Sequence, residues 1–214
     1  MQPRYSREEF ARRGDEIYES DVVPRVGEED KGKFVVIDIE TRAFEVDRDE
    51  LAAMDRLRAR NGCAALVASG RFSLCLSLRR PPTRDSSSSM MIGTVNALHE
   101  AVLRVLVRGP EGEEREVEAV VDTGFGGSLT LPPYLVAELG LPFLVRGIAL
   151  LGDGSRSSFD AHEGMVHWNG QPRRISVEVA DTEPLLGMSL MGGNELTIEV
   201  MEGGVVSIRE LLPS

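Results

Sequence analysis

AVVDTGFGGSLTLP, residues 119–132, places an aspartate at the end of an apolar run and follows it with threonine and glycine. A hydrophobic strand that ends in Asp122 removes this carboxylate at least partly from water. An ionised group is costly to bury unless hydrogen bonds or a neighbouring charge compensate for the lost hydration. Asp122 therefore belongs either to an ordinary turn or to a site that uses its carboxylate.

The composition is that of a globular protein with a sizeable core. The chain has 214 residues, of which 42% are hydrophobic and 28% are charged, close to the averages for soluble domains. Because domains commonly span roughly 100 to 200 residues, this length allows either one domain or two.

The formal net charge of -11 is unevenly distributed along the chain. Residues 1–89 contain 16 basic and 17 acidic residues, a balance of -1, whereas residues 90–214 contain 8 basic and 18 acidic residues, a balance of -10. Nucleic acids and anionic membrane surfaces attract clustered lysine and arginine. The acidic second part therefore predicts that neither a nucleic acid nor a membrane is a partner.

Cys63 and Cys75 are the two cysteines, too few for a disulfide framework and without the CxxC spacing of zinc and redox sites. We expect reduced thiols and neither a metal nor a cofactor. The N-terminus has no apolar stretch of signal-peptide length, and no run approaches the roughly 18 apolar residues of a membrane span. These features predict a cytoplasmic protein.

Residues 1–85 are expected to form a small α+β module of unknown role. Ser6 and Glu9 have the spacing of a capping box and predict a helix. Two short strands follow, and a second pair, Asp47 as cap with Glu50 as its partner, predicts another helix. The module ends in a linker rich in proline and serine.

Residues 90–214 are expected to form a separate, mainly β domain of short strands and turns. Asp153-Gly154 and Asn169-Gly170 are strong hairpin signals. Pro133 opens a short helix that ends at Gly140. Because the linker is polar, the first module is expected to be dispensable for any chemistry of the second.

Three elements of this second part resemble the retropepsin-like (clan AA) aspartic proteases. They are Asp-Thr-Gly after an apolar strand, the hairpin LLGDGSRS at 150–157, and Leu-Leu-Gly before a short helix. The resemblance covers about residues 90–214 and implies a closed β-barrel of the acid protease type. The residues it implies are the catalytic Asp122, its loop supports Thr123 and Gly124, a substrate-covering flap of Gly152, Asp153 and Gly154, and the core supports Leu185, Leu186 and Gly187.

The resemblance also implies the chemistry. Aspartic proteases set two carboxylates against one water, and two such charges a few ångströms apart share a proton. Asp-Thr-Gly occurs once in this chain, so one copy supplies half a site. The resemblance therefore implies a homodimeric bacterial endopeptidase that cleaves peptides or proteins without a metal or cofactor.

Two features depart from this pattern. Asp181-Thr182 is followed by Glu183 instead of glycine, which favours a plain turn. Retroviral members follow Asp-Thr-Gly with a small residue and a substrate-gripping aspartate, where this chain has Phe125 and Gly126. A substrate preference therefore cannot be transferred from the family.

Other functions stay open at this point. The β domain could be a non-catalytic dimerisation or interaction module. Residues 1 to about 80 faintly resemble short antitoxin-like bacterial proteins, which implies a regulator as a further alternative. Three other motifs are weaker indications of function. GFGGS is not followed by the helix that a dinucleotide-binding loop requires, and GMSLMG differs by one residue from the G-x-S-x-G motif of serine hydrolases. His99, His162 and His167 lack the spacing of metal ligands.

Overall fold

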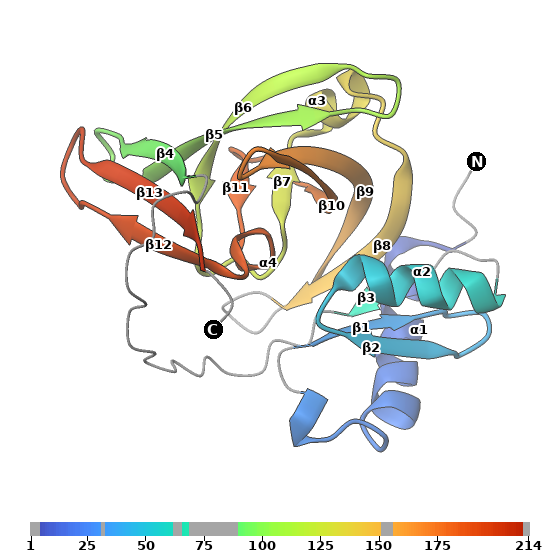
Figure 1. Ribbon diagram of the computed structural model, residues 1–214. Helices are drawn as coiled ribbons and strands as arrows, with labels where there is room; N and C mark the ends of the chain where they lie inside the picture. The colour runs from blue at the N-terminus through green and yellow to red at the C-terminus, as the bar shows by residue number, and fades with distance from the viewer. Residues whose placement is uncertain (1–4, 31–32, 62–65, 69–89, 151–155, 212–214) are drawn as a thin grey trace. The chain divides into compact units, whose positions relative to one another are not determined.

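The computed structural model describes residues 5–30, 33–61, 66–68, 90–150 and 156–211 (Figure 1). The chain divides into two compact units. Unit 1 comprises Met1–Cys75 and Phe143–Ala161, and unit 2 comprises Leu76–Pro142 and His162–Ser214. This division differs from the expected one, in which all of residues 90–214 form one domain, because Phe143–Ala161 joins the N-terminal unit.

Unit 1 combines helices with neighbouring β-strands. Its elements are α1 (Arg7–Ile17), a π-helix (Tyr18–Val22), a 3-10 helix (Glu28–Asp30), β1 (Phe34–Ile37), β2 (Phe44–Asp47), α2 (Glu50–Asn61), β3 (Leu66–Ala68), β8 (Phe143–Leu150) and the first part of β9 (Arg156–Trp168). Strand β1 pairs antiparallel with both β2 and β3, and β3 pairs parallel with β8. The order β2-β1-β3-β8 therefore includes a strand from far along the sequence.

The first predicted cap is confirmed and the second is wrong. The Ser6 hydroxyl accepts a hydrogen bond from the Glu9 N–H at 3.2 Å, at the start of α1. Helix α2 is capped by Asp49, whose Oδ1 accepts from the Leu51 N–H at 2.9 Å. Asp47 is the last residue of β2 and accepts from the Asp49 N–H instead. Because β2 extends through Asp47, the helix begins later than expected.

Packing explains why the segment from Phe143 to Ala161 belongs to unit 1. Leu144, Val145 and Ala161 are each no more than 1% exposed. They belong to a core cluster whose other buried members come from β1 and α2, namely Val36, Leu51, Ala53, Met54 and Leu57. The segment thus completes a hydrophobic core that residues 1–75 supply only in part.

Unit 2 is mainly β, as expected. Its elements are β4 (Met90–Val95), β5 (Ala101–Arg108), β6 (Glu114–Val121), β7 (Leu129–Leu131), α3 (Pro133–Glu138), the second part of β9, β10 (Gln171–Val179), β11 (Leu185–Leu186), α4 (Met188–Met191), β12 (Asn194–Ile198) and β13 (Val205–Glu210). The strand order is β12-β13-β4-β5-β6-β11-β7-β10-β9. Strand β5 pairs with both β6 and β9. The pairings that run from β5 through β6, β11, β7, β10 and β9 therefore return to β5.

Alternation along the strands of unit 2 separates core from solvent. In β5, Leu103, Val105 and Val107 are buried, whereas Arg104, between the first two, and Arg108, after the last, are exposed. The buried residues of β5 join a core cluster with residues of β6, β7, β9, β10 and β11. A period of two is the expected pattern for a sheet with one face in the core.

The turn signals of unit 2 hold where the structure describes them. Asn169 and Gly170 have φ values of 50° and 75°, as a type I′ hairpin turn between β9 and β10 requires. Gly140, with φ 59°, follows α3 where the helix was expected to end. The predicted hairpin tip at Gly152, Asp153 and Gly154 lies outside the described residues. Among the described residues, no helix is long and apolar enough to cross a membrane.

Candidate active site

Asp122 lies directly after β6, in unit 2, and is half-buried. Its backbone N–H donates a hydrogen bond to the Leu186 carbonyl oxygen at 2.9 Å. Its Oδ1 accepts a hydrogen bond from the Gly124 N–H at 2.7 Å. Both the backbone and the carboxylate of Asp122 are therefore held by main-chain groups, which fixes the direction in which the carboxylate points.

Strand β11 lies between β6 and β7, the two strands that the Asp122 loop connects (Figure 1). Leu185 and Leu186 pair in parallel with Val120 and Val121. Leu186 also pairs antiparallel with Leu129 and is fully buried. The structure therefore brings together the Asp-Thr-Gly and Leu-Leu-Gly elements that lie far apart in the sequence.

Backbone hydrogen bonds also join the loop to the start of α4. Gly187 donates to the Ser128 carbonyl at 3.0 Å. The next two residues continue the pattern, since the Met188 N–H donates to the Phe125 carbonyl at 2.9 Å and the Ser189 N–H donates to the Gly127 carbonyl at 3.1 Å. Three consecutive donors thus pin the loop from Phe125 to Ser128.

Two glycines of this site, Gly187 and Gly124, have close neighbours that leave little room for a side chain. A Cβ atom at Gly187 would lie 2.1 Å from the Gly127 carbonyl oxygen and 2.5 Å from Cδ1 of Phe125. At Gly124 a Cβ atom would lie 2.9 Å from Oδ1 of Asp122 itself. The first contact is with backbone, so a side chain at Gly187 would force the loop to move.

Phe125, Gly127 and Glu178 also lie at this site, and the sequence patterns did not predict a role there for these three residues. A Cβ atom at Gly127 would lie 2.4 Å from both Oε1 of Glu178 and Cζ of Phe125. Glu178 is half-buried in β10, opposite Thr130 of β7. Its carboxylate therefore lies against the Asp122 loop. The two glycines after Phe125 were the one available signal. They indicated that other atoms approach the backbone closely at this point, but they did not indicate which residue supplies those atoms.

The remaining predicted residues fall into three groups. Thr123 and Gly124 are exposed beside Asp122. Asp181 and Thr182 form an exposed bend, in which the Thr182 hydroxyl donates to the Glu183 carbonyl at 3.3 Å. The structure does not describe the flap residues Gly152, Asp153 and Gly154.

The histidines do not converge on a metal site. In the part of the chain that the structure describes, no three His, Cys, Asp or Glu side chains are placed to hold a metal ion. Nδ1 of His162 lies 2.7 Å from the Leu141 carbonyl oxygen, a contact within the fold.

Comparison with known proteins gives limited similarity. No protein-family model matches the sequence, and no curated protein matches it. Among solved structures, a retropepsin-like aspartic protease from Rickettsia conorii is similar over 62% of this chain and 100% of its own length, with 14% sequence identity and a TM-score of 0.39. Similarity at this level does not assign the chain to a family.

Proposed function

We propose that this chain is an aspartic-type endopeptidase in which Asp122 from each of two copies forms the catalytic pair. The observation that carries the proposal is the setting of Asp122. Its half-buried carboxylate follows a core strand and accepts the Gly124 N–H at 2.7 Å. Leu186 and the residues after it hold the surrounding loop rigid. An ordinary exposed turn does not need a further strand between the two strands that it connects, as β11 lies between β6 and β7.

The proposed reaction is hydrolysis by an activated water molecule. One carboxylate takes a proton from the water, whose oxygen bonds to the carbonyl carbon of the peptide. The protonated partner carboxyl gives its proton to the carbonyl oxygen. The tetrahedral intermediate then breaks at the C–N bond, and a proton returned by the pair accompanies the departing amine. No metal or covalent nucleophile is needed in this sequence of steps.

The need for a second copy follows from stoichiometry. The acid and base roles require two carboxylates, and the sequence contains Asp-Thr-Gly once. A two-fold axis duplicates Asp122 without any further sequence. The substrate would be a peptide or protein, and Thr123 and Gly124 would support the loop of the pair.

The strand pairings support the barrel that this function needs. A closed barrel requires a circuit of paired strands, and the pairings here run from β5 through β6, β11, β7, β10 and β9 back to β5. We propose that this circuit is the acid-protease barrel.

A pair of isosteric variants tests the proposal. Asp122→Asn should abolish cleavage of a quenched fluorescent peptide library while leaving the circular dichroism spectrum unchanged. Asp181→Asn is the matched control, because it makes the same change in an exposed Asp-Thr dipeptide, and it should retain full activity. Full cleavage by Asp122→Asn would overturn the proposal.

A further inference from the structure

Two turns of unit 2 present apolar side chains to solvent. The β4–β5 turn leaves Leu98 75% exposed, and the β12–β13 turn leaves Val200 and Met201 73% and 62% exposed. Val205, the first residue of β13, is 44% exposed. We call these four residues the tip cluster. Turns usually carry polar residues and glycine, and grouped exposed apolar side chains mark surfaces of association.

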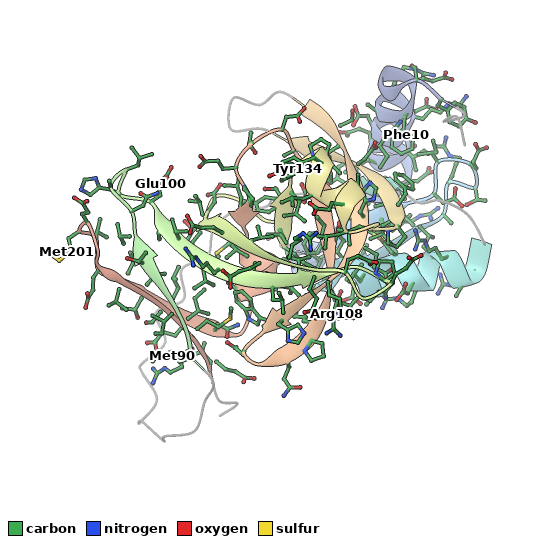
Figure 2. The ribbon with its side chains drawn as sticks, turned by 90° about the horizontal axis from the view of Figure 1, so that it is seen from above. Phe10, Met90, Glu100, Arg108, Tyr134 and Met201 are labelled. Atoms are coloured by element: carbon green, nitrogen blue, oxygen red, sulfur yellow. The ribbon has the colours of Figure 1, made fainter. Side chains whose placement is uncertain are left out.

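The two turns are neighbours. The Val95 N–H donates to the Gly204 carbonyl at 2.9 Å, and the Gly203 N–H donates to the Val95 carbonyl at 2.9 Å. Figure 2 shows Glu100 and Met201, one from each turn region, at the same end of the sheet and away from Arg108. The tip cluster is therefore one surface feature built from two turns.

Acidic residues of these turns are partly engaged by the turns themselves. The Glu100 carboxylate accepts a hydrogen bond from the Asn96 amide at 2.7 Å. The Glu199 carboxylate accepts from the Val205 N–H at 3.1 Å. Glu202 remains exposed. Because two of the three acids bond within the turns, the apolar side chains dominate what the tips present.

The tip cluster lies at the same end of the sheet as Asp122. Val102 of β5 pairs with Val120 of β6, so β6 ends, directly before Asp122, where β5 begins. Strand β4 ends and β13 begins at this same edge. From β6 to β13 there are three strand spacings of about 4.8 Å, or about 15 Å in all.

We propose that the tip cluster is part of the surface through which unit 2 contacts a second copy of this chain. The inference rests on the proposed function and names the surface that it requires. Two carboxylates that share a proton lie a few ångströms apart, so the two-fold axis must pass beside Asp122. A two-fold interface then sets the surface around Asp122 against the same surface of the partner.

A stable interface is large enough to include the two turns that carry the tip cluster. An interface of standard size buries about 800 Å² on each partner, which corresponds to a patch of roughly 16 Å radius. A patch of this radius centred beside Asp122 reaches β13 and both turns. The tip cluster thus gives this surface apolar side chains that association removes from water.

Sedimentation velocity of the full chain tests the proposal. Met201→Glu and, from the other turn, Leu98→Glu should each raise the dimer dissociation constant at least tenfold. Tyr134→Glu is the matched control, since Tyr134 is 67% exposed and lies on α3. Helix α3 lies at the opposite end of the β5–β6 hairpin, where its C-cap Leu139 approaches Gly109. The control should dimerise like the wild type.

The outcomes separate this inference from the proposed function. If both tip variants dimerise like the wild type, the surface proposal is wrong, whatever the peptidase assay shows. If the tip variants are folded monomers and the wild-type dimer cleaves no peptide, the proposed dimer surface is correct and the proposed peptidase function is wrong. A wild-type chain that stays monomeric at every concentration overturns the surface proposal.

Discussion

The N–H of Asp122 and the carbonyl of Leu186 form a hydrogen bond of 2.9 Å that links the candidate catalytic loop to strand β11. Because Leu186 has no exposed surface, movement of this strand is coupled to the core of unit 2. The position of the Asp122 carboxylate therefore depends on residues that cannot touch a substrate.

Gly187→Ala should demonstrate this dependence. The new methyl group would lie 2.1 Å from the Gly127 carbonyl oxygen, so the loop must shift and activity should fall at least 100-fold. Gly192→Ala is the control, because its Cβ would lie 3.4 Å from the nearest atom and its φ is -52°. Peptidase kinetics and thermal melts of both variants check this. Equal effects at the two glycines would contradict it.

The proposed pair predicts how activity varies with pH. Catalysis needs one proton on the pair, so activity should fall at low pH, where both carboxyls are protonated, and at higher pH, where neither is. The dependence of kcat/KM on pH should be bell-shaped with a maximum on the acid side of neutrality. Constant activity into the alkaline range would exclude a shared proton.

Acid should weaken unit 1 through Asp47. The Asp49 N–H and the Arg56 guanidinium lower the pKa of Asp47 below its ordinary 3.8. Because the folded-state pKa is the lower one, the stabilisation is present above about pH 4 and is lost as the pH falls through the folded-state value. Asp47→Asn should lower the Tm at pH 7 by about 1–3 °C.

Thermal melts at pH 7 and pH 2.5 check this prediction. The difference in Tm between Asp47→Asn and the wild type should shrink at the lower pH, because a larger fraction of the wild-type chains then has this carboxyl group protonated. A difference that is unchanged at pH 2.5 would show that the carboxylate charge contributes nothing.

A fragment that starts at Met90 should fold poorly, contrary to the expectation that the first module is dispensable. Such a fragment lacks the residues of β1 and α2 that cover Leu144, Val145 and Ala161. It should bind the dye ANS more strongly than the full chain does. Adding Leu144→Ser and Val145→Ser to the fragment should reduce the dye signal. A fragment with native-like melting and no dye binding would show that the segment does not need unit 1.

Local patterns were enough to predict much of unit 2. Short strand-like segments separated by turn signals predicted a mainly β domain, and Asn169-Gly170 predicted a hairpin turn because both residues readily adopt positive φ. The meeting of Asp122 with Leu186 could be expected only through the resemblance to aspartic proteases. No local rule links two segments so far apart in sequence.

The misplaced cap of α2 shows how a local pattern becomes ambiguous. Asp47 and Asp49 are both good N-cap residues. The choice depends on where β2 stops, and its pairing with β1 carries the strand through Asp47. A capping rule that considers the helix alone cannot include this pairing.

Glu178 and the segment from Phe143 to Ala161 could not be predicted for a related reason. Glu178 approaches Gly127 because β10 lies beside β7 in parallel. The segment joins unit 1 because β8 lies beside β3. Both facts depend on which strands become neighbours, and the sequence of either strand alone does not encode its neighbour.

The two-segment construction of unit 1 has a consequence for synthesis on the ribosome. Residues 1–75 emerge first, yet their core remains incomplete until Leu144, Val145 and Ala161 have also been made. At about 5–20 residues per second, the intervening 86 residues take roughly 4 to 17 s to translate. During this interval the nascent chain carries an unfinished hydrophobic surface, and unit 2 begins to emerge before unit 1 can close.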